Sequence, residues 1–113
     1  MDLQVKVLEE NLTHHFEVIG EIDAFTVPVL KERLEAVQHI EDVQVVIDLS
    51  TVEYIDSTGL GVLIGFYKAL QKVNGYVKII GVNERVERLF KITGIDKIID
   101  IEVKKGGSND ATV

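Results

Sequence analysis

The sequence contains no cysteine and no tryptophan, and only one of its 113 residues is proline. Without cysteine, disulfides, thiolate metal sites and thiol nucleophiles are excluded, and nothing favours an oxidising compartment. The longest uncharged run, residues 57–67, is far shorter than the roughly 20 residues that a membrane span requires. The first residues also lack the basic and apolar regions of a signal peptide. These absences predict a cytoplasmic protein that does not enter the membrane.

Positive charge is scarce, with 12 basic against 19 acidic side chains and a formal net charge of -7. This balance repels nucleic acid and anionic lipid, and it favours a protein partner with a basic face. The histidines His14, His15 and His39 have no metal-ligand spacing, and a Ser-His-Asp triad would need a histidine later in the chain. We therefore expect no metal, no cofactor, no small-molecule substrate and no enzymatic activity.

The composition, 46% hydrophobic and 27% charged, predicts one compact domain with its own core. The domain is expected to cover residues 1–103. Residues 104–113 begin with two lysines and continue with small polar residues, which predicts a flexible C-terminal tail.

Apolar periodicity predicts the elements in the order ββαβαβα, followed by a short strand or helix. Thr26 and Asn83 are predicted helix N-caps, and Asn74-Gly75 and Gly94 are predicted helix ends. The predicted elements are an N-terminal hairpin, helices over 26–39, 57–73 and 83–94, strands over 43–49 and 76–80, and a last apolar run over 97–103. The nearly continuous apolar strand 43–49 should be central and covered on both faces. We expect an α/β fold whose mixed sheet has parallel central strands and helices packed against it.

The pair Ser57-Thr58 stands where a strand-and-turn region gives way to an amphipathic helix. A helix start can carry an anion, because its first N–H groups lack helical partners and the macrodipole is positive there. The same pattern fits a Ser57 that only caps the helix, with Gly59 and Gly61 allowing close packing on the sheet. Asp56 either orients the Ser57 hydroxyl or hydrogen-bonds a turn. The loop over 20–23 is expected to lie beside this one, because both leave carboxyl ends of strands.

Three segments carry a resemblance to a known family: Gly20-Glu21-Ile22-Asp23 and the residues up to 30, residues 48–63 with the motif Asp56-Ser57-Thr58-Gly59, and residues 77–90. They resemble the STAS-domain anti-anti-sigma factors, also called anti-sigma factor antagonists, of the general-stress RsbV type. The resemblance implies a STAS-like single domain that binds an anti-sigma factor, itself a serine kinase, and so frees a sigma factor for transcription.

The resemblance also implies a switch. The kinase would phosphorylate Ser57, and the phosphorylated chain would no longer bind the kinase. A PP2C-type phosphatase would remove the phosphate and restore the form that binds. Asp23 falls on the family position beside the acceptor that contributes to kinase recognition. Asp56, Thr58 and Gly59 surround Ser57 in the motif and complete the expected partner-binding residues.

Two other functions fit parts of the sequence. The module could be a non-switching STAS component of a transporter accessory complex or of a stress-sensing assembly, with Ser57 used only as a cap. A phosphorelay reading would make Asp48 or Asp56 an aspartyl-phosphate acceptor, with Glu9-Glu10 and either Lys97 or Lys104 holding magnesium and phosphate.

Overall fold

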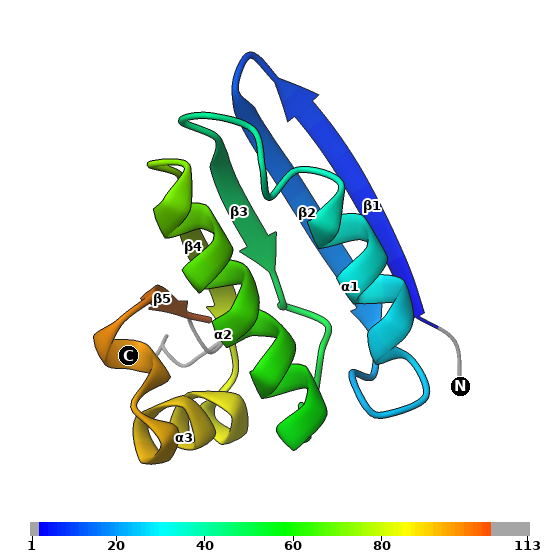
Figure 1. Ribbon diagram of the computed structural model, residues 1–113. Coiled ribbons are helices and arrows are strands. Elements are labelled where there is room, and N and C mark those ends of the chain that lie inside the picture. Colours follow the sequence, from blue (N-terminus) through cyan, green and yellow to red (C-terminus); the bar gives the residue numbers. More distant parts are fainter. Residues whose placement is uncertain (1–2, 105–113) are drawn as a thin grey trace, which may run out of the picture.

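The computed structural model describes residues 3–104, which form a five-stranded sheet with the helices of residues 27–35 and 57–72 over one face and the helix of residues 84–93 near one end (Figure 1). The fold begins with an antiparallel hairpin of β1 (Leu3–Glu10) and β2 (Thr13–Gly20). Asn11 opens the turn between them with a φ of 59°, a conformation that asparagine tolerates better than most residues. The predicted hairpin is confirmed.

Helices and strands then alternate along the chain. They are α1 (Val27–Glu35), β3 (Gln44–Asp48), α2 (Ser57–Lys72), β4 (Tyr76–Val82), α3 (Glu84–Thr93), the 3-10 helix η1 (Ile95–Lys97) and β5 (Asp100–Val103). The strand order is β1-β2-β3-β4-β5, and every pair after the hairpin is parallel. The predicted α/β fold is confirmed, with β3 at the centre of a mixed, mostly parallel sheet.

Burial alternates along the central strand. Val45 and Ile47 are fully buried, whereas Val46 and Asp48 are only partly buried. The expectation that β3 is covered on both faces is therefore wrong. Right-handed crossovers between strands that advance in one direction place their helices on the same face. Figure 1 shows α1 and α2 on that face, which leaves the opposite face partly open.

The helix ends follow local sequence signals at most positions. The Asn83 side chain accepts a hydrogen bond from the Val86 N–H at 2.8 Å, and Gly94 ends α3 with a φ of 81°. Asn74, just after α2, has a φ of 58°. These three signals are confirmed. The first helix ends at Glu35, earlier than the predicted end, because turns replace helix over residues 36–39.

Thr26 stands at the N-cap position of α1, as predicted, but its side chain makes no capping hydrogen bond. Its hydroxyl instead donates to the Glu21 carbonyl at 2.6 Å and accepts from the Asp23 N–H at 3.0 Å. Thr26 is only 3% exposed, and these bonds tie the loop between β2 and α1 to itself.

Lys104 falls in the predicted tail, yet it is bonded to the domain. Its N–H donates to the Val82 carbonyl at 2.7 Å, and its Nζ donates to the Ser50 carbonyl at 3.0 Å. The rest of the predicted tail, residues 105–113, lies outside the described residues. Within residues 3–104 no helix is long and apolar enough to cross a membrane.

Candidate functional site

The loops that leave β2 and β3 lie side by side at the carboxyl ends of these strands (Figure 1). Ile22 and Ile55 form an isolated parallel bridge, and the Asp56 N–H donates to the Ile22 carbonyl at 3.2 Å. The predicted proximity of the two loops is confirmed. This contact brings the loop that contains Asp23 next to the start of α2, where Ser57 lies.

Asp56 is the N-cap of α2. Its Oδ1 accepts hydrogen bonds from the Thr58 N–H at 3.0 Å, the Gly59 N–H at 3.1 Å and the Thr58 hydroxyl at 2.5 Å. Ser57 is consequently the first residue of the helix, and the interpretation that it caps α2 is wrong. Of the two roles considered for Asp56, the structure favours hydrogen bonding to the turn over orienting the Ser57 hydroxyl, because the carboxylate faces the N–H groups at the helix start.

The hydrogen bond from the Thr58 hydroxyl lowers the pKa of Asp56 below its ordinary value. Desolvation opposes this shift, and hydrogen bonds from the backbone N–H groups of Gly59, Thr58 and Ala24 add to it. Hydrogen bonds to the ionised form favour that form. The start of α2 thus carries a negative charge at neutral pH before any modification.

The two hydroxyls of the motif have different surroundings. Ser57 and Thr58 are both exposed, but the Thr58 hydroxyl is engaged with Asp56. Among the side-chain hydrogen bonds of residues 3–104, none holds the Ser57 hydroxyl. Ser57 therefore presents an exposed hydroxyl that no side chain of the described residues engages.

Asp23 is half-buried, and its carboxylate points into its own loop. Its Oδ1 accepts from the Phe25 N–H at 2.9 Å and from the Thr26 N–H at 3.1 Å. This is the geometry of an Asx turn, in which the side chain fixes the residues that follow it. The turn presents Phe25, which is 88% exposed. Phe25 was missed from the sequence, where its only signal is an aromatic residue within a polar loop.

The three glycines of α2 differ in their surroundings. Gly59 is buried, and a Cβ on it would lie 2.5 Å from Ile22 Cγ2 and 2.7 Å from Ile55 Cγ2. The predicted close packing is confirmed there. A Cβ on Gly61 or Gly65 would have no neighbour within 4 Å, so that explanation is wrong for Gly61.

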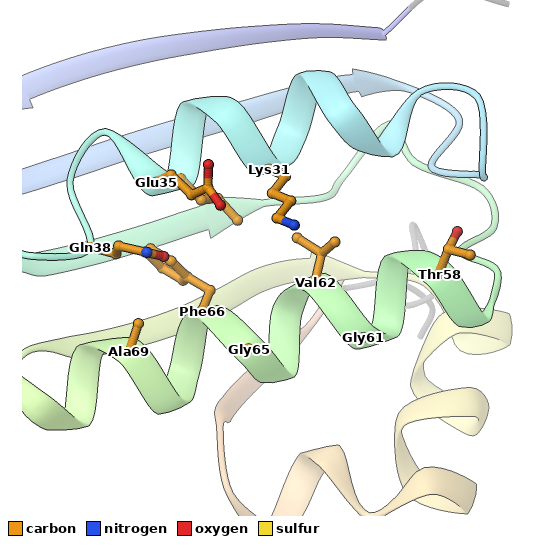
Figure 2. A pocket seen from close by; sticks show the side chains of 10 residues that line it. Lys31, Glu35, Gln38, Thr58, Gly61, Val62, Gly65, Phe66 and Ala69 are labelled. Carbon is orange, nitrogen blue, oxygen red and sulfur yellow. The ribbon is translucent and has the colours of Figure 1, made fainter.

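Gly61 and Gly65 line a groove of about 520 Å³ between α1 and α2. Figure 2 shows Thr58 at one end of the groove and Lys31 of α1 reaching toward Val62 of α2. The groove therefore opens beside the candidate site and continues along α2.

The loop that precedes α2 is held from the side of α3. Asn83 Nδ2 donates to the Val52 and Glu53 carbonyls, both at 3.3 Å. The Arg85 guanidinium lies 5.8 Å from the centre of the Tyr54 ring, within range of a cation–π contact. These contacts fix the backbone that delivers Ser57.

The phosphorelay reading conflicts with the topology. Because β1 is antiparallel, its last residue Glu10 pairs with Thr13, which pairs with Gln44 at the start of β3. Glu9 and Glu10 therefore lie at the opposite end of the sheet from Asp48, whose Oδ1 accepts from the Ser50 N–H and hydroxyl at 2.9 and 2.7 Å. Among residues 3–104 no cluster of acidic or histidine side chains is arranged to hold a metal ion.

These features define a small α/β domain with an exposed serine at the start of a helix on its sheet. The chain belongs to the STAS domain family, whose model matches residues 4–106. The anti-sigma-B factor antagonist of Listeria monocytogenes is 41% identical over 110 residues, which cover 96% of each chain. That of Bacillus subtilis is 39% identical over 107 residues, covering 95% of this chain and 97% of the relative.

The crystal structure of an anti-sigma factor antagonist from Mycobacterium paratuberculosis has the same fold. It superposes with a TM-score of 0.79 at 31% identity, over 88% of this chain and 85% of that one. The resemblance to RsbV-type anti-sigma factor antagonists is thereby confirmed. The family is one of regulatory proteins and not of enzymes.

Proposed function

We propose that this chain, in its unphosphorylated form, binds an anti-sigma factor that is also a serine kinase, and that this binding releases a sigma factor for transcription. The proposal includes a cytoplasmic location and an off state produced by phosphorylation of Ser57. A PP2C-type phosphatase returns the chain to its binding form. Asp23, Asp56, Ser57, Thr58 and Gly59 form or support the docking surface.

The exposed Ser57 hydroxyl is the observation that carries this proposal. Phosphoryl transfer is achieved mainly by positioning the acceptor, so an acceptor must reach the γ-phosphate without local unfolding. Ser57 meets this requirement because it projects from the first turn of a capped helix. Thr58 is a poorer acceptor, because its hydroxyl would first have to leave Asp56.

A phosphate on Ser57 would change the charge of the surface more than its shape. It adds about 1.5 to 2 negative charges at neutral pH. Asp56 already occupies the N–H groups of Thr58 and Gly59, so the phosphate would extend outward beside an existing carboxylate. Like charges and added bulk then oppose a partner that fits the unmodified surface. The switch therefore acts at the interface and leaves the fold nearly unchanged.

The helix macrodipole still favours an anion at this position, which limits the cost of phosphorylation to the fold. Gly59 is buried and supports the proposed docking surface indirectly, because it allows α2 to approach Ile22 and Ile55 closely. The other four residues of the proposed surface are exposed or half-buried and can reach a partner directly.

Mass spectrometry after incubation with the anti-sigma factor kinase and Mg-ATP tests the proposal. Wild type should gain one phosphate at residue 57, whereas Ser57→Ala should gain none and still bind the ADP-loaded kinase. A chain that neither binds the kinase nor becomes labelled would refute the regulatory role. If the chain is instead a non-switching STAS module, the wild-type chain should neither bind the kinase nor gain a phosphate.

A further inference from the structure

Phe25 has the largest exposed fraction among the large apolar side chains of residues 3–104, at 88%. An exposed apolar side chain is common on protein surfaces and identifies nothing alone. Two further properties distinguish Phe25. Its backbone is held in one conformation, and its loop contacts the start of α2, where the proposed phosphoacceptor lies.

The loop that carries Phe25 is fixed from both sides. Asp23 Oδ1 accepts the Phe25 N–H at 2.9 Å, and the buried Thr26 donates its hydroxyl to the Glu21 carbonyl at 2.6 Å. A side chain on a fixed loop loses less conformational entropy on binding than one on a mobile loop. Phe25 is therefore preorganised to insert into a partner.

The same loop contacts the start of α2. Ile22 forms a parallel bridge with Ile55, and the Ile22 carbonyl accepts from the Asp56 N–H at 3.2 Å. Phe25 thus lies in the loop whose residue Ile22 is bonded to the cap of α2, and the cap is adjacent to Ser57. A kinase that brings ATP to the Ser57 hydroxyl must approach this loop as well.

We propose that Phe25 is the apolar anchor by which the chain docks on its kinase, and that Asp23 acts by positioning Phe25 rather than through its charge. This inference rests on the proposed function and identifies the contact that carries it. The complementary feature on the kinase is an apolar pocket with basic side chains at its rim. Exposed Glu21 and Glu53 and the net charge of -7 favour such a rim.

Aromatic side chains at the centre of an interface commonly dominate its binding energy, and truncating one of them commonly costs about 2 kcal/mol or more. That value corresponds to about 30-fold in Kd. Phe25 belongs to a different loop from the reacting hydroxyl, so its loss should weaken docking while leaving the chemical step intact.

Calorimetric titration with the ADP-loaded anti-sigma factor kinase measures the docking. Phe25→Ala should raise Kd by about 30-fold or more. The matched control is Leu12→Ala, because Leu12 is 52% exposed in the hairpin turn at the opposite end of the sheet, and it should leave Kd unchanged. With Mg-ATP, Phe25→Ala should raise the KM for the chain and keep kcat. A Kd for Phe25→Ala equal to that of wild type overturns the proposal.

Two substitutions of Asp23 separate positioning from charge. Asp23→Asn retains an oxygen that can accept the Phe25 and Thr26 N–H groups, so its Kd should stay within about threefold of wild type. Asp23→Ala should approach the loss seen for Phe25→Ala. Adding Asp23→Ala to Phe25→Ala should cost little more, because the two residues act as one unit. Equal losses for Asp23→Asn and Asp23→Ala would show that the charge itself contacts the kinase, and would overturn the positioning role.

The controls also separate this inference from the function on which it rests. If wild type binds the kinase and is phosphorylated at Ser57 while Phe25→Ala binds equally well, only the anchor is wrong. If wild type itself neither binds the kinase nor becomes phosphorylated, the proposed function is refuted, and the anchor role of Phe25 is refuted with it. Circular dichroism of each variant should match wild type, because Phe25 is exposed and Asp23 lies in a loop.

Discussion

Alanine substitutions at the glycines of α2 should change stability in opposite directions. A methyl group at Gly59 would lie 2.5 Å from Ile22 Cγ2 and 2.7 Å from Ile55 Cγ2. Both isoleucines are buried, β-branched and joined by a backbone bridge, so neither can move aside easily. Overpacking of this kind costs about 1–3 kcal/mol. The intrinsic gain from replacing a helical glycine is at most about 1 kcal/mol, so we expect Gly59→Ala to destabilise the fold by about 1–2 kcal/mol.

Gly61 provides the matched comparison in the same helix. A methyl group there meets no atom within 4 Å, so only the helix preference for alanine remains. Gly61→Ala should therefore stabilise the fold by about 0.5–1 kcal/mol. Gly65→Ala is a second variant of the same kind, because a methyl group at that position is equally unobstructed.

Urea unfolding followed by circular dichroism measures the difference. With a slope of about 2 kcal/mol per molar urea for a domain of this size, the midpoints of Gly59→Ala and Gly61→Ala should differ by about 1 M, with wild type between them. Coincident midpoints, or a Gly59→Ala midpoint at or above that of wild type, would refute the packing argument. A changed slope would instead indicate a changed denatured or native state.

Three further predictions follow from individual hydrogen bonds and charges. Ser57→Asp should lose kinase binding with amide chemical shifts that change only around the start of α2; a global rearrangement would contradict a switch at the interface. The lowered pKa of Asp56 means that its stabilising effect is present above the ordinary pKa and lost as pH falls through the lowered one. The gap in urea midpoint between wild type and Asp56→Ala should thus shrink from pH 6 to pH 3, and a constant gap would show that the charge is irrelevant. The pKa of Tyr76 is raised, chiefly by the hydrogen bond that its hydroxyl donates to Asp100. Desolvation and the negative charge of Asp100 raise it further. Asp100→Asn should lower that pKa in an ultraviolet titration, and an unchanged pKa would exclude the contact.

The sign for Tyr76 is opposite to that for Asp56. Because the pKa of Tyr76 is raised in the folded chain, its contribution to stability is complete below the ordinary tyrosine pKa and is lost as pH rises through the raised value. Acid therefore removes the contribution of Asp56, whereas alkali removes that of Tyr76.

The order of the elements and the position of Ser57 at the start of α2 could be read from the sequence, because the signals involved are local. Hydrophobic periodicity depends only on neighbouring residues along one element. The cap at Asn83 and the left-handed ends at Asn74 and Gly94 depend on a few adjacent backbone angles. The pair Ser57-Thr58, which indicated the start of α2, is likewise a signal carried by adjacent residues.

Other features required the folded chain. Asp56 rather than Ser57 caps α2, because the loop enters the helix with Asp56 extended and its carboxylate facing two N–H groups. The sequence could not separate Gly59 from Gly61, because the folded positions of Ile22 and Ile55 make a methyl group clash at Gly59 and not at Gly61.

The amino-acid sequence by itself determined the strands, the helices and the serine at their junction, since these arise from preferences within short stretches. Only the tertiary structure decided which face of the sheet stays partly open, which glycine of α2 has no room for a methyl group and which exposed aromatic side chain lies in the loop against the start of α2. These properties depend on contacts between segments that are distant in sequence. The handedness of the crossovers and the packing of the β2 loop against the β3 loop set those contacts.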